Sequence, residues 1–123
     1  MTRTVWQSTV TYLGTDAAMM FEAGVYILFG EPVPAALAEV SLVHNGPSEP
    51  FTPLQVGDVF GVGDGAVTIT EVGALANTNF EQLGHIVLYL NVPDADLLPG
   101  AVKATGSLTP PTVGDPIAIT RTA

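Results

Sequence analysis

The chain has 123 residues, 47% of them hydrophobic and 12% charged, and its mean hydropathy is +0.42. These values exclude a disordered chain and fit one domain, residues 1–123, while the absence of cysteine excludes disulfides, thiolate metal sites and a cysteine nucleophile. Three basic against twelve acidic residues give a net charge of −9, which excludes nucleic acids and anionic membrane surfaces as partners and favours partners with basic faces.

Thirteen glycines and ten prolines separate short runs of β-branched and aromatic residues, which is typical of an all-β sandwich or barrel. The first run, Thr4–Leu13, alternates between apolar and polar residues. It predicts a half-buried strand with Trp6, Val10 and Tyr12 on the buried face. The start of the chain lacks a continuous apolar stretch, so we expect no signal peptide and a cytoplasmic protein.

Two short helical turns are expected in the next part of the chain. Asp16 is placed to cap the first turn, over Ala17–Glu22, because its side chain can accept a hydrogen bond from a free backbone N–H. Pro34 is placed to begin the second, since proline suits the first position of a helix. Strands are predicted over Val25–Phe29 and over Glu39–His44.

The C-terminal half continues this pattern after a loop that contains Pro47, Pro50 and Pro53, where a strand cannot continue. Strands are predicted near Asp58–Val62, Ala66–Val72, His85–Asn91, Ala101–Gly106 and Pro116–Thr120. Gly63-Asp64-Gly65 is predicted to form a hairpin turn, and Ala74–Leu83 reads as one helical turn and a loop. The chain is therefore predicted to form an all-β sandwich or barrel of about seven to eight strands.

Few motifs in the chain carry chemistry. Gly57-Asp58 and Gly114-Asp115 each precede an apolar strand, and such pairs form either ordinary turns or a site with two carboxylates; we favour the turns. The sequence contains no phosphate-binding loop, no nucleophile elbow and no His-Glu-x-x-His motif. The candidates for chemistry are therefore the two histidines, His44 and His85.

These two histidines lie at complementary strand ends. His44 ends its predicted strand on the same face as Leu42, and His85 begins another strand. If the two strands are close and antiparallel, both imidazoles meet at one rim of the sheet. Such a pair suits a metal site completed by an acid such as Glu39 or Glu81, or phosphoryl transfer through a phosphohistidine. Two unrelated, hydrogen-bonded histidines at strand ends are the remaining alternative.

Four segments of the chain follow one another in a recognisable order. They are Trp6–Gly14, Ala36–Glu39 leading to Leu42–His44, Leu83–Tyr89, and Leu98–Val102 followed by Gly106. Together they resemble the glucitol/sorbitol-specific IIA component of the bacterial sugar phosphotransferase system (PTS), and the likeness covers nearly the whole chain. Its most specific part is Leu83-Gly84-His85 before an apolar strand, followed by Pro99-Gly100 and another strand.

The resemblance implies a small closed or partly closed β-barrel of about seven to eight strands, without metal or cofactor. This barrel would carry a phosphoryl group on Nε2 of His44. The group would come from the histidine phosphocarrier protein HPr and pass to the IIB unit of a glucitol/sorbitol permease, whose IIB and IIC subunits are membrane-bound partners. The family pattern continues past this histidine with polar groups that include a second histidine. This chain instead has Asn45-Gly46-Pro47, which leaves His85 as the supporting donor.

Two other functions stay open on the residues alone. One is a non-catalytic β-barrel module that binds a sugar or a regulatory protein. The other is a metal-dependent hydrolase that uses His44 and His85. Apolar strands exposed on a barrel of this size also allow a homodimer.

Overall fold

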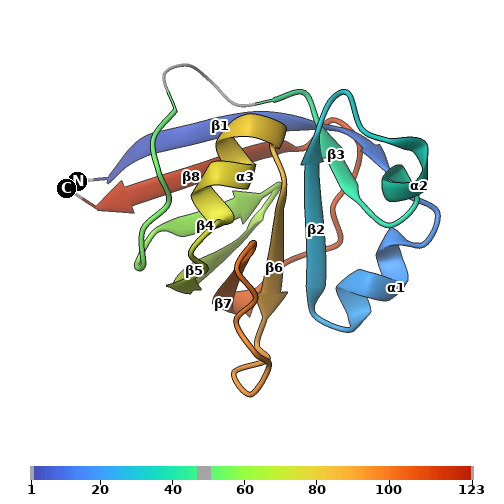
Figure 1. Cartoon of the computed structure of the whole chain (residues 1–123). Helices are drawn as coiled ribbons and strands as arrows, with labels where there is room; N and C mark the ends of the chain where they lie inside the picture. The colour runs from blue at the N-terminus through green and yellow to red at the C-terminus, as the bar shows by residue number, and fades with distance from the viewer. Residues whose placement is uncertain (1, 47–50, 123) are drawn as a thin grey trace.

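The computed structural model describes residues 2–46 and 51–122, in which eight strands close into a barrel with three short helices beside them (Figure 1). The strands are β1 (Thr2–Leu13), β2 (Val25–Gly30), β3 (Leu42–His44), β4 (Val59–Val62), β5 (Gly65–Val72), β6 (Ile86–Leu90), β7 (Ala101–Ser107) and β8 (Pro116–Thr122). The helices are α1 (Ala17–Glu22), α2 (Ala35–Ala38) and α3 (Ala76–Leu83). The predicted all-β barrel is confirmed, and it is closed.

The order of strands around the barrel is β1-β3-β2-β6-β7-β5-β4-β8, which returns to β1. Neighbouring strands are antiparallel except β2–β3 and β6–β7, which are parallel. Thr2 pairs with Thr122, so the beginning of β1 and the end of β8 lie side by side, as Figure 1 shows. Strand β2 separates β3 from β6, so the end of β3 and the start of β6 reach the same rim.

Apolar side chains from alternating strand positions fill the barrel, and Trp6 and Phe60 are among the largest that are fully buried. Helix α3, which lies beside β6 (Figure 1), adds Ala76 and Phe80 to this core. The rings of Trp6 and Phe80 lie 4.5 Å apart between centroids. Burial of one such aromatic side chain contributes about 1.5–3 kcal/mol to the free energy of folding. Phe80 therefore holds α3 against the barrel.

Strand β1 contains two shifts in register that correct one prediction. Its pairing shifts between Val10 and Tyr12 on the β3 side, and between Thr4 and Trp6 on the β8 side. An extra residue of this kind interrupts the alternation of faces along a strand. Trp6 and Val10 are buried as predicted, whereas Tyr12 is 41% exposed. The prediction that Tyr12 shares their buried face is therefore wrong.

The region around α1 and α2 differs from the prediction in detail. Helix α1 has the predicted bounds, but the side chain of Asp16 makes no capping hydrogen bond, and its backbone N–H donates to the Glu39 carbonyl at 2.8 Å. Strand β3 begins at Leu42 rather than at Glu39. The cause is the end of α2, where the Ser41 N–H still donates to the Ala38 carbonyl at 3.2 Å.

The turns follow the prediction closely. Gly63-Asp64 is the two-residue turn between β4 and β5. Asp58 accepts the Gln55 N–H at 2.8 Å, and Asp115 accepts the Thr112 N–H at 2.9 Å. These matching bonds confirm that the Gly-Asp pairs are turn chemistry. The two carboxylates do not form a shared site.

Three further predictions concern the middle of the chain. The ambiguous region Ala74–Leu83 contains the whole of α3, a longer helix than the single turn expected. Pro53 lies outside any strand, as predicted, while Pro47 and Pro50 lie outside the described residues. Among the helices of residues 2–46 and 51–122, we find none with the length and apolar character needed to cross a membrane.

Candidate functional site

The two histidines reach one rim of the barrel, as their strand ends predicted. His44 is the last residue of β3 and pairs with Gly30 at the end of β2. Ile86 opens β6 and pairs with Leu28 of β2, so His85 directly precedes this strand. Since β3 runs parallel to β2 and β6 antiparallel to it, the two strands run in opposite directions on either side of β2. The backbone arrangement is therefore the predicted one.

The side chain of His44 is fully buried, with 0% of its surface exposed. Leu42, two residues earlier on β3, belongs to the barrel core, and alternation places His44 on the same inner face. Its ring meets the ring of Trp6 edge to face, with centroids 5.2 Å apart and planes at 78°. This contact orients the imidazole at the mouth of the core.

Both ring nitrogens of His44 have partners that define its protonation. The Gly84 carbonyl lies 2.8 Å from Nε2, and a carbonyl can only accept, so Nε2 carries a proton. The Gly46 N–H points at Nδ1 from 3.1 Å and can only donate, so Nδ1 holds a lone pair. His44 is therefore a neutral imidazole with its lone pair on Nδ1, a form that can act as a nucleophile.

The carbonyl that holds Nε2 is placed by the end of α3. Gly84 follows this helix with a φ of +64°, the left-handed conformation that ends many helices, and its N–H donates to the Phe80 carbonyl at 2.9 Å. The backbone here approaches the imidazole so closely that a Cβ on Gly84 would lie 2.8 Å from Cε1 of His44. Glycine at this position thus serves both the turn and the fit around the ring.

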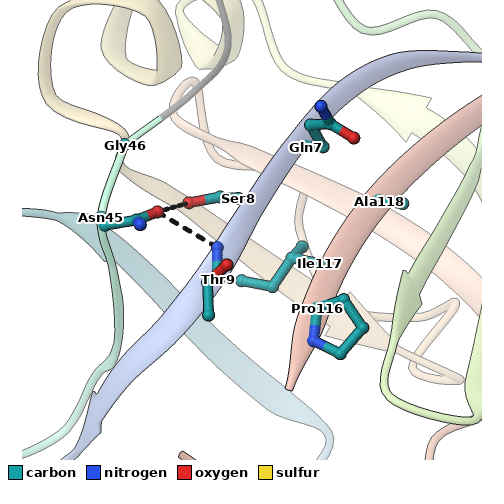
Figure 2. Close-up of a pocket in the computed structure, with 8 residues that line it drawn as sticks. All are labelled: Gln7, Ser8, Thr9, Asn45, Gly46, Pro116, Ile117 and Ala118. Carbon is teal, nitrogen blue, oxygen red and sulfur yellow. Dashed lines mark hydrogen bonds between the residues drawn. The ribbon is translucent and has the colours of Figure 1, made fainter. Parts of the chain in front are cut away.

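Asn45 connects the end of β3 to β1 on the other side of the imidazole. Figure 2 shows its side-chain oxygen accepting hydrogen bonds from the Ser8 hydroxyl at 2.9 Å and from the Thr9 N–H at 3.2 Å. The Ser8 hydroxyl also lies 3.0 Å from Nδ1 of His44. Ser8, Asn45 and Gly46 therefore form one hydrogen-bonded group around the lone pair of His44.

The environment of His44 favours its neutral form. Burial lowers the pKa of His44 below its usual value, because a charged imidazolium would lose its hydration there. The Gly84 carbonyl and the negative charge of Glu31 act in the opposite direction and raise the pKa, but burial outweighs them. The imidazole is consequently unprotonated at Nδ1 near neutral pH.

Two pockets flank this site. The larger, which we call the polar pocket, has a volume of about 520 Å³ and is the one drawn in Figure 2. Its lining residues are Gln7, Ser8, Thr9, Asn45, Gly46, Pro116, Ile117 and Ala118. The smaller, which we call the acidic pocket, has a volume of about 210 Å³. Its lining residues are Gly30, Glu31, Pro32, Gly46, Glu81, Gln82, Leu83 and Gly84. Gly46 belongs to both, so the His44 site lies between the two pockets.

His85 faces away from this site. Its Nδ1 lies 2.9 Å from the Leu28 carbonyl, and its ring packs against that of Phe29 with centroids 4.6 Å apart and planes at 32°. Leu28 belongs to the apolar cluster inside the barrel and Phe29, although buried, does not, so alternation places Phe29 and the imidazole beside it on the outer face. The structure therefore does not bring the two imidazoles together, and direct support of His44 by His85 stays a prediction without a contact behind it.

The acids considered for a metal site do not complete one with the histidines. Glu39 accepts a hydrogen bond from the Thr15 hydroxyl, and Glu81 lines the acidic pocket. Within residues 2–46 and 51–122, no group of three His, Asp or Glu side chains is arranged to hold a metal ion. Another acid, Asp58, is buried and forms an ion pair with Arg121 at 2.8 Å, which ties β8 to the turn before β4.

Sequence reasoning missed four residues of the site. Ser8, Asn45 and Gly46 surround Nδ1, and Gly84 holds Nε2. The signals available were the Asn-Gly pair directly after His44 and the glycine directly before His85. Neither shows which ring nitrogen it serves, because that depends on how β1 and α3 pack against β3.

The fold and site thus define a small closed β-barrel with one buried, neutral histidine at its rim, and comparison with known proteins agrees with this class. The family model described as PTS system glucitol/sorbitol-specific IIA component matches residues 5–118. The "PTS system glucitol/sorbitol-specific EIIA component" proteins of Shigella flexneri and of Escherichia coli (strain K12) are each 30% identical over 102 residues, 83% of this chain and 82% of each relative.

A solved structure agrees at the level of the fold. The crystal structure of a PTS system IIA component from Enterococcus faecalis V583 matches with a TM-score of 0.75 and 30% identity, over 90% of this chain and 96% of that one. The chain belongs to the family of glucitol/sorbitol-specific IIA components of the PTS. The resemblance inferred from the sequence is confirmed.

Proposed function

We propose that this protein is a phosphocarrier that accepts a phosphoryl group from phospho-HPr on His44 and passes it to the IIB unit of a glucitol/sorbitol permease. The observation that carries the proposal is the state of His44, whose imidazole is buried, neutral and held by the Gly84 carbonyl with a lone pair on its other nitrogen. This is the state that nucleophilic attack on phosphorus requires.

Phosphoryl transfer between two histidines requires few further groups from the protein. The donor in this scheme is itself a phosphohistidine, so the transfer exchanges one P–N bond for another of similar energy. Catalysis then consists of positioning the nucleophile and stabilising the phosphoryl oxygens. Backbone N–H and hydroxyl donors, such as those around Nδ1, can serve this purpose in a chain with only three basic residues.

The charge of the chain supports partners with basic faces. The net charge is −9, and two of the three basic residues are engaged with acids, Lys103 with Glu71 and Arg121 with Asp58. Glu31 and Glu81 add carboxylates in the acidic pocket beside the site. We therefore propose that HPr and the IIB unit dock here through basic surfaces, in the cytoplasm, with electrostatic attraction speeding the encounter.

The test is reconstituted phosphorylation. The protein is incubated with phosphoenolpyruvate, enzyme I and HPr, and phosphate uptake is measured for the wild type, His44→Gln and His85→Gln. We expect the wild type and His85→Gln to take up one acid-labile phosphate and His44→Gln to take up none. Glutamine keeps much of the buried volume of His44, so the loss reports chemistry rather than unfolding. Uptake by His44→Gln at the wild-type level would exclude His44 as the acceptor.

A further inference from the structure

We infer that the phosphoryl donor protein docks on the outer face of α3, where an apolar patch on the donor meets three exposed leucines and its basic side chains face Glu31 and Glu81. We call this face the α3 surface, and its leucines are Leu75, Leu83 and Leu98. The inference rests on the proposed function. It adds to that function the place of docking and the chemistry of the partner.

Exposed apolar side chains are concentrated on the α3 surface. Eight large hydrophobic side chains are exposed in the part of the chain that the structure describes, and three of them belong to α3 and the segments beside it. Leu75, Leu83 and Leu98 are 52%, 50% and 51% exposed. Single exposed apolar residues are ordinary on a protein surface, whereas a group of them on one face marks a site of interaction.

The pattern of burial along α3 places two of these leucines on one stripe. Ala76 and Phe80 are the buried residues of the helix and face the core. Leu75 directly precedes α3, and Asn79 and Leu83 follow it at intervals of four residues. Residues spaced in this way are neighbours on a helix surface, so the two leucines lie along one side of α3 with Asn79 between them.

The third leucine belongs to a segment that runs beside this stripe. The Leu75 N–H donates to the Pro99 carbonyl at 2.8 Å, which fixes the backbone next to Leu98. One residue further, a Cβ on Gly100 would lie 3.0 Å from the side-chain nitrogen of Asn79. The segment therefore borders the stripe, and Leu98 widens its apolar area.

The α3 surface reaches the rim at which His44 lies. Leu83 is the last residue of α3, which ends beside the start of β6 (Figure 1), and the next residue, Gly84, contacts the imidazole. The eight residues of α3 span about 12 Å. A transient interface covers roughly 600 Å² on each partner, a patch roughly 25 Å across. A donor protein that reaches His44 from this side therefore covers the whole α3 surface.

The charges beside the leucines define the chemistry of the partner. Glu31 and Glu81 are exposed and line the acidic pocket together with Leu83. Neither carboxylate belongs to an ion pair within residues 2–46 and 51–122. The polar pocket, on the other side of His44, has no charged side chain in its lining. Charge thus directs a partner with a basic rim and an apolar centre to the α3 side.

Chemical-shift titration tests the location of the interface. The ¹⁵N-labelled protein is titrated with unphosphorylated HPr at concentrations above the KM for phospho-HPr. We expect the largest shift changes within Leu75–Leu83 and Leu98–Gly100. Changes confined to Gln7–Thr9 and Asn45–Gly46, around the polar pocket, would overturn the inference, and so would the absence of any change.

Substitution of the leucines tests whether the α3 surface contributes to binding. Leu83→Gln and Leu75→Gln each remove a half-exposed leucine, and Leu75 lies two helical turns from the turn at Gly84. The control is Met19→Gln, because Met19 is 66% exposed on α1, which precedes the start of β2, whereas His44 pairs with the end of β2.

The readout is the initial rate of phosphate uptake at varied concentrations of phospho-HPr. We expect KM to rise about tenfold in each leucine variant with kcat unchanged, as for the loss of an interface residue, and Met19→Gln to match the wild type. A leucine variant with the KM of Met19→Gln, or with a lower kcat alone, would overturn the inference and leave the proposed function standing. Failure of the wild type to take up phosphate would instead overturn the proposed function.

A second pair of variants tests the basic character of the partner. Glu81→Gln and Glu22→Gln each remove one negative charge from an exposed position, the first in the acidic pocket and the second at the end of α1. The net charge changes equally, so a difference between them reports local complementarity. We expect a KM about threefold higher in Glu81→Gln at low salt, and no difference at high salt, where the charges are screened. Equal KM values at low salt would overturn the assignment of a basic partner.

Discussion

His44 and His85 reach the same rim of one barrel, yet their surroundings differ in every respect that matters for chemistry. His44 lies on the inner face against Trp6, with partners on both ring nitrogens. His85 is half-buried on the outer face, packed against Phe29 and hydrogen-bonded to the Leu28 carbonyl. Strand ends bring residues to a rim, but the side of the sheet decides what each residue can do.

The bond from His44 to Gly84 joins the two regions. The Gly84 carbonyl holds Nε2 of His44, and the next residue is His85. His85 is therefore linked to the site through the backbone, and its ring bond to the Leu28 carbonyl helps to fix this segment against β2. The difference between the two histidines leads to three predictions, beginning with the largest effect.

Truncation of each histidine should affect stability very differently. His44→Ala leaves a cavity against Trp6 and removes the partner of the Gly84 carbonyl, so we expect a loss of about 2–5 kcal/mol in the free energy of unfolding. His85→Ala removes one hydrogen bond from a half-buried ring, for which we expect about 1 kcal/mol. Urea unfolding followed by Trp6 fluorescence measures both values.

The expected loss in His44→Ala is larger than the position of His44 at a strand end suggests by itself. A residue at a strand end suggests that His44→Ala leaves the fold nearly unaffected, but the structure buries the ring completely. Equal losses of stability in His44→Ala and His85→Ala would contradict the difference in burial that the comparison rests on.

A methyl group on Gly84 should disturb His44 beyond its effect on the turn. Gly84→Ala places a Cβ 2.8 Å from Cε1 of His44 at a φ of +64°, whereas Gly114→Ala has a φ of +97° and no atom within 4 Å of its Cβ. Both variants carry the strain of a left-handed residue, about 1–2 kcal/mol. We expect Gly84→Ala to lose about 1–3 kcal/mol more, from overpacking around the ring.

The same pair of variants distinguishes an effect on the turn from an effect on the His44 site. Phosphate uptake should slow in Gly84→Ala and stay near the wild-type rate in Gly114→Ala, because only the first displaces the imidazole. The measurement is the initial rate in the reconstituted system. Matching rates would show that the Gly84 carbonyl does not position His44.

Acid should destabilise the protein through His44. Burial lowers the pKa of His44 in the folded state, while the unfolded chain keeps the usual value of about 6.5. As the pH falls below 6.5, which is about the unfolded pKa, His44 binds a proton in the unfolded chain but not in the folded protein. The stability that His44 contributes at higher pH is therefore lost progressively, until the pH reaches the pKa of His44 in the folded state. The slope is at most about 1.4 kcal/mol per pH unit for one proton.

Unfolding curves between pH 7.5 and 5 test this prediction. We expect the stability of the wild type to fall more steeply than that of His44→Gln, which has no imidazole at this position. His85→Gln retains His44 and should keep the additional slope. Parallel curves for the wild type and His44→Gln would mean that the buried ring takes up its proton as easily as an exposed one.

The local pattern of the sequence determined most of the barrel. Runs of alternating apolar residues between glycines and prolines predicted the strands, and two-residue turns such as Gly63-Asp64 follow from backbone preferences within a few residues. The same is true of Asp58 and Asp115, whose turn bonds reach back only three residues. Such features are local, so the sequence determines them before the chain is packed.

Only the tertiary structure decided which face of a strand a side chain occupies and which hydrogen-bond partners it meets. The register shifts in β1 turn Tyr12 outward, although the sequence alternates regularly there. Likewise, the packing of α3 and β1 against β3 decides that the Gly84 carbonyl takes Nε2 of His44 and that Ser8 meets Nδ1. These contacts join residues 36 to 40 positions apart, and their geometry depends on how the barrel closes rather than on any run of neighbouring residues.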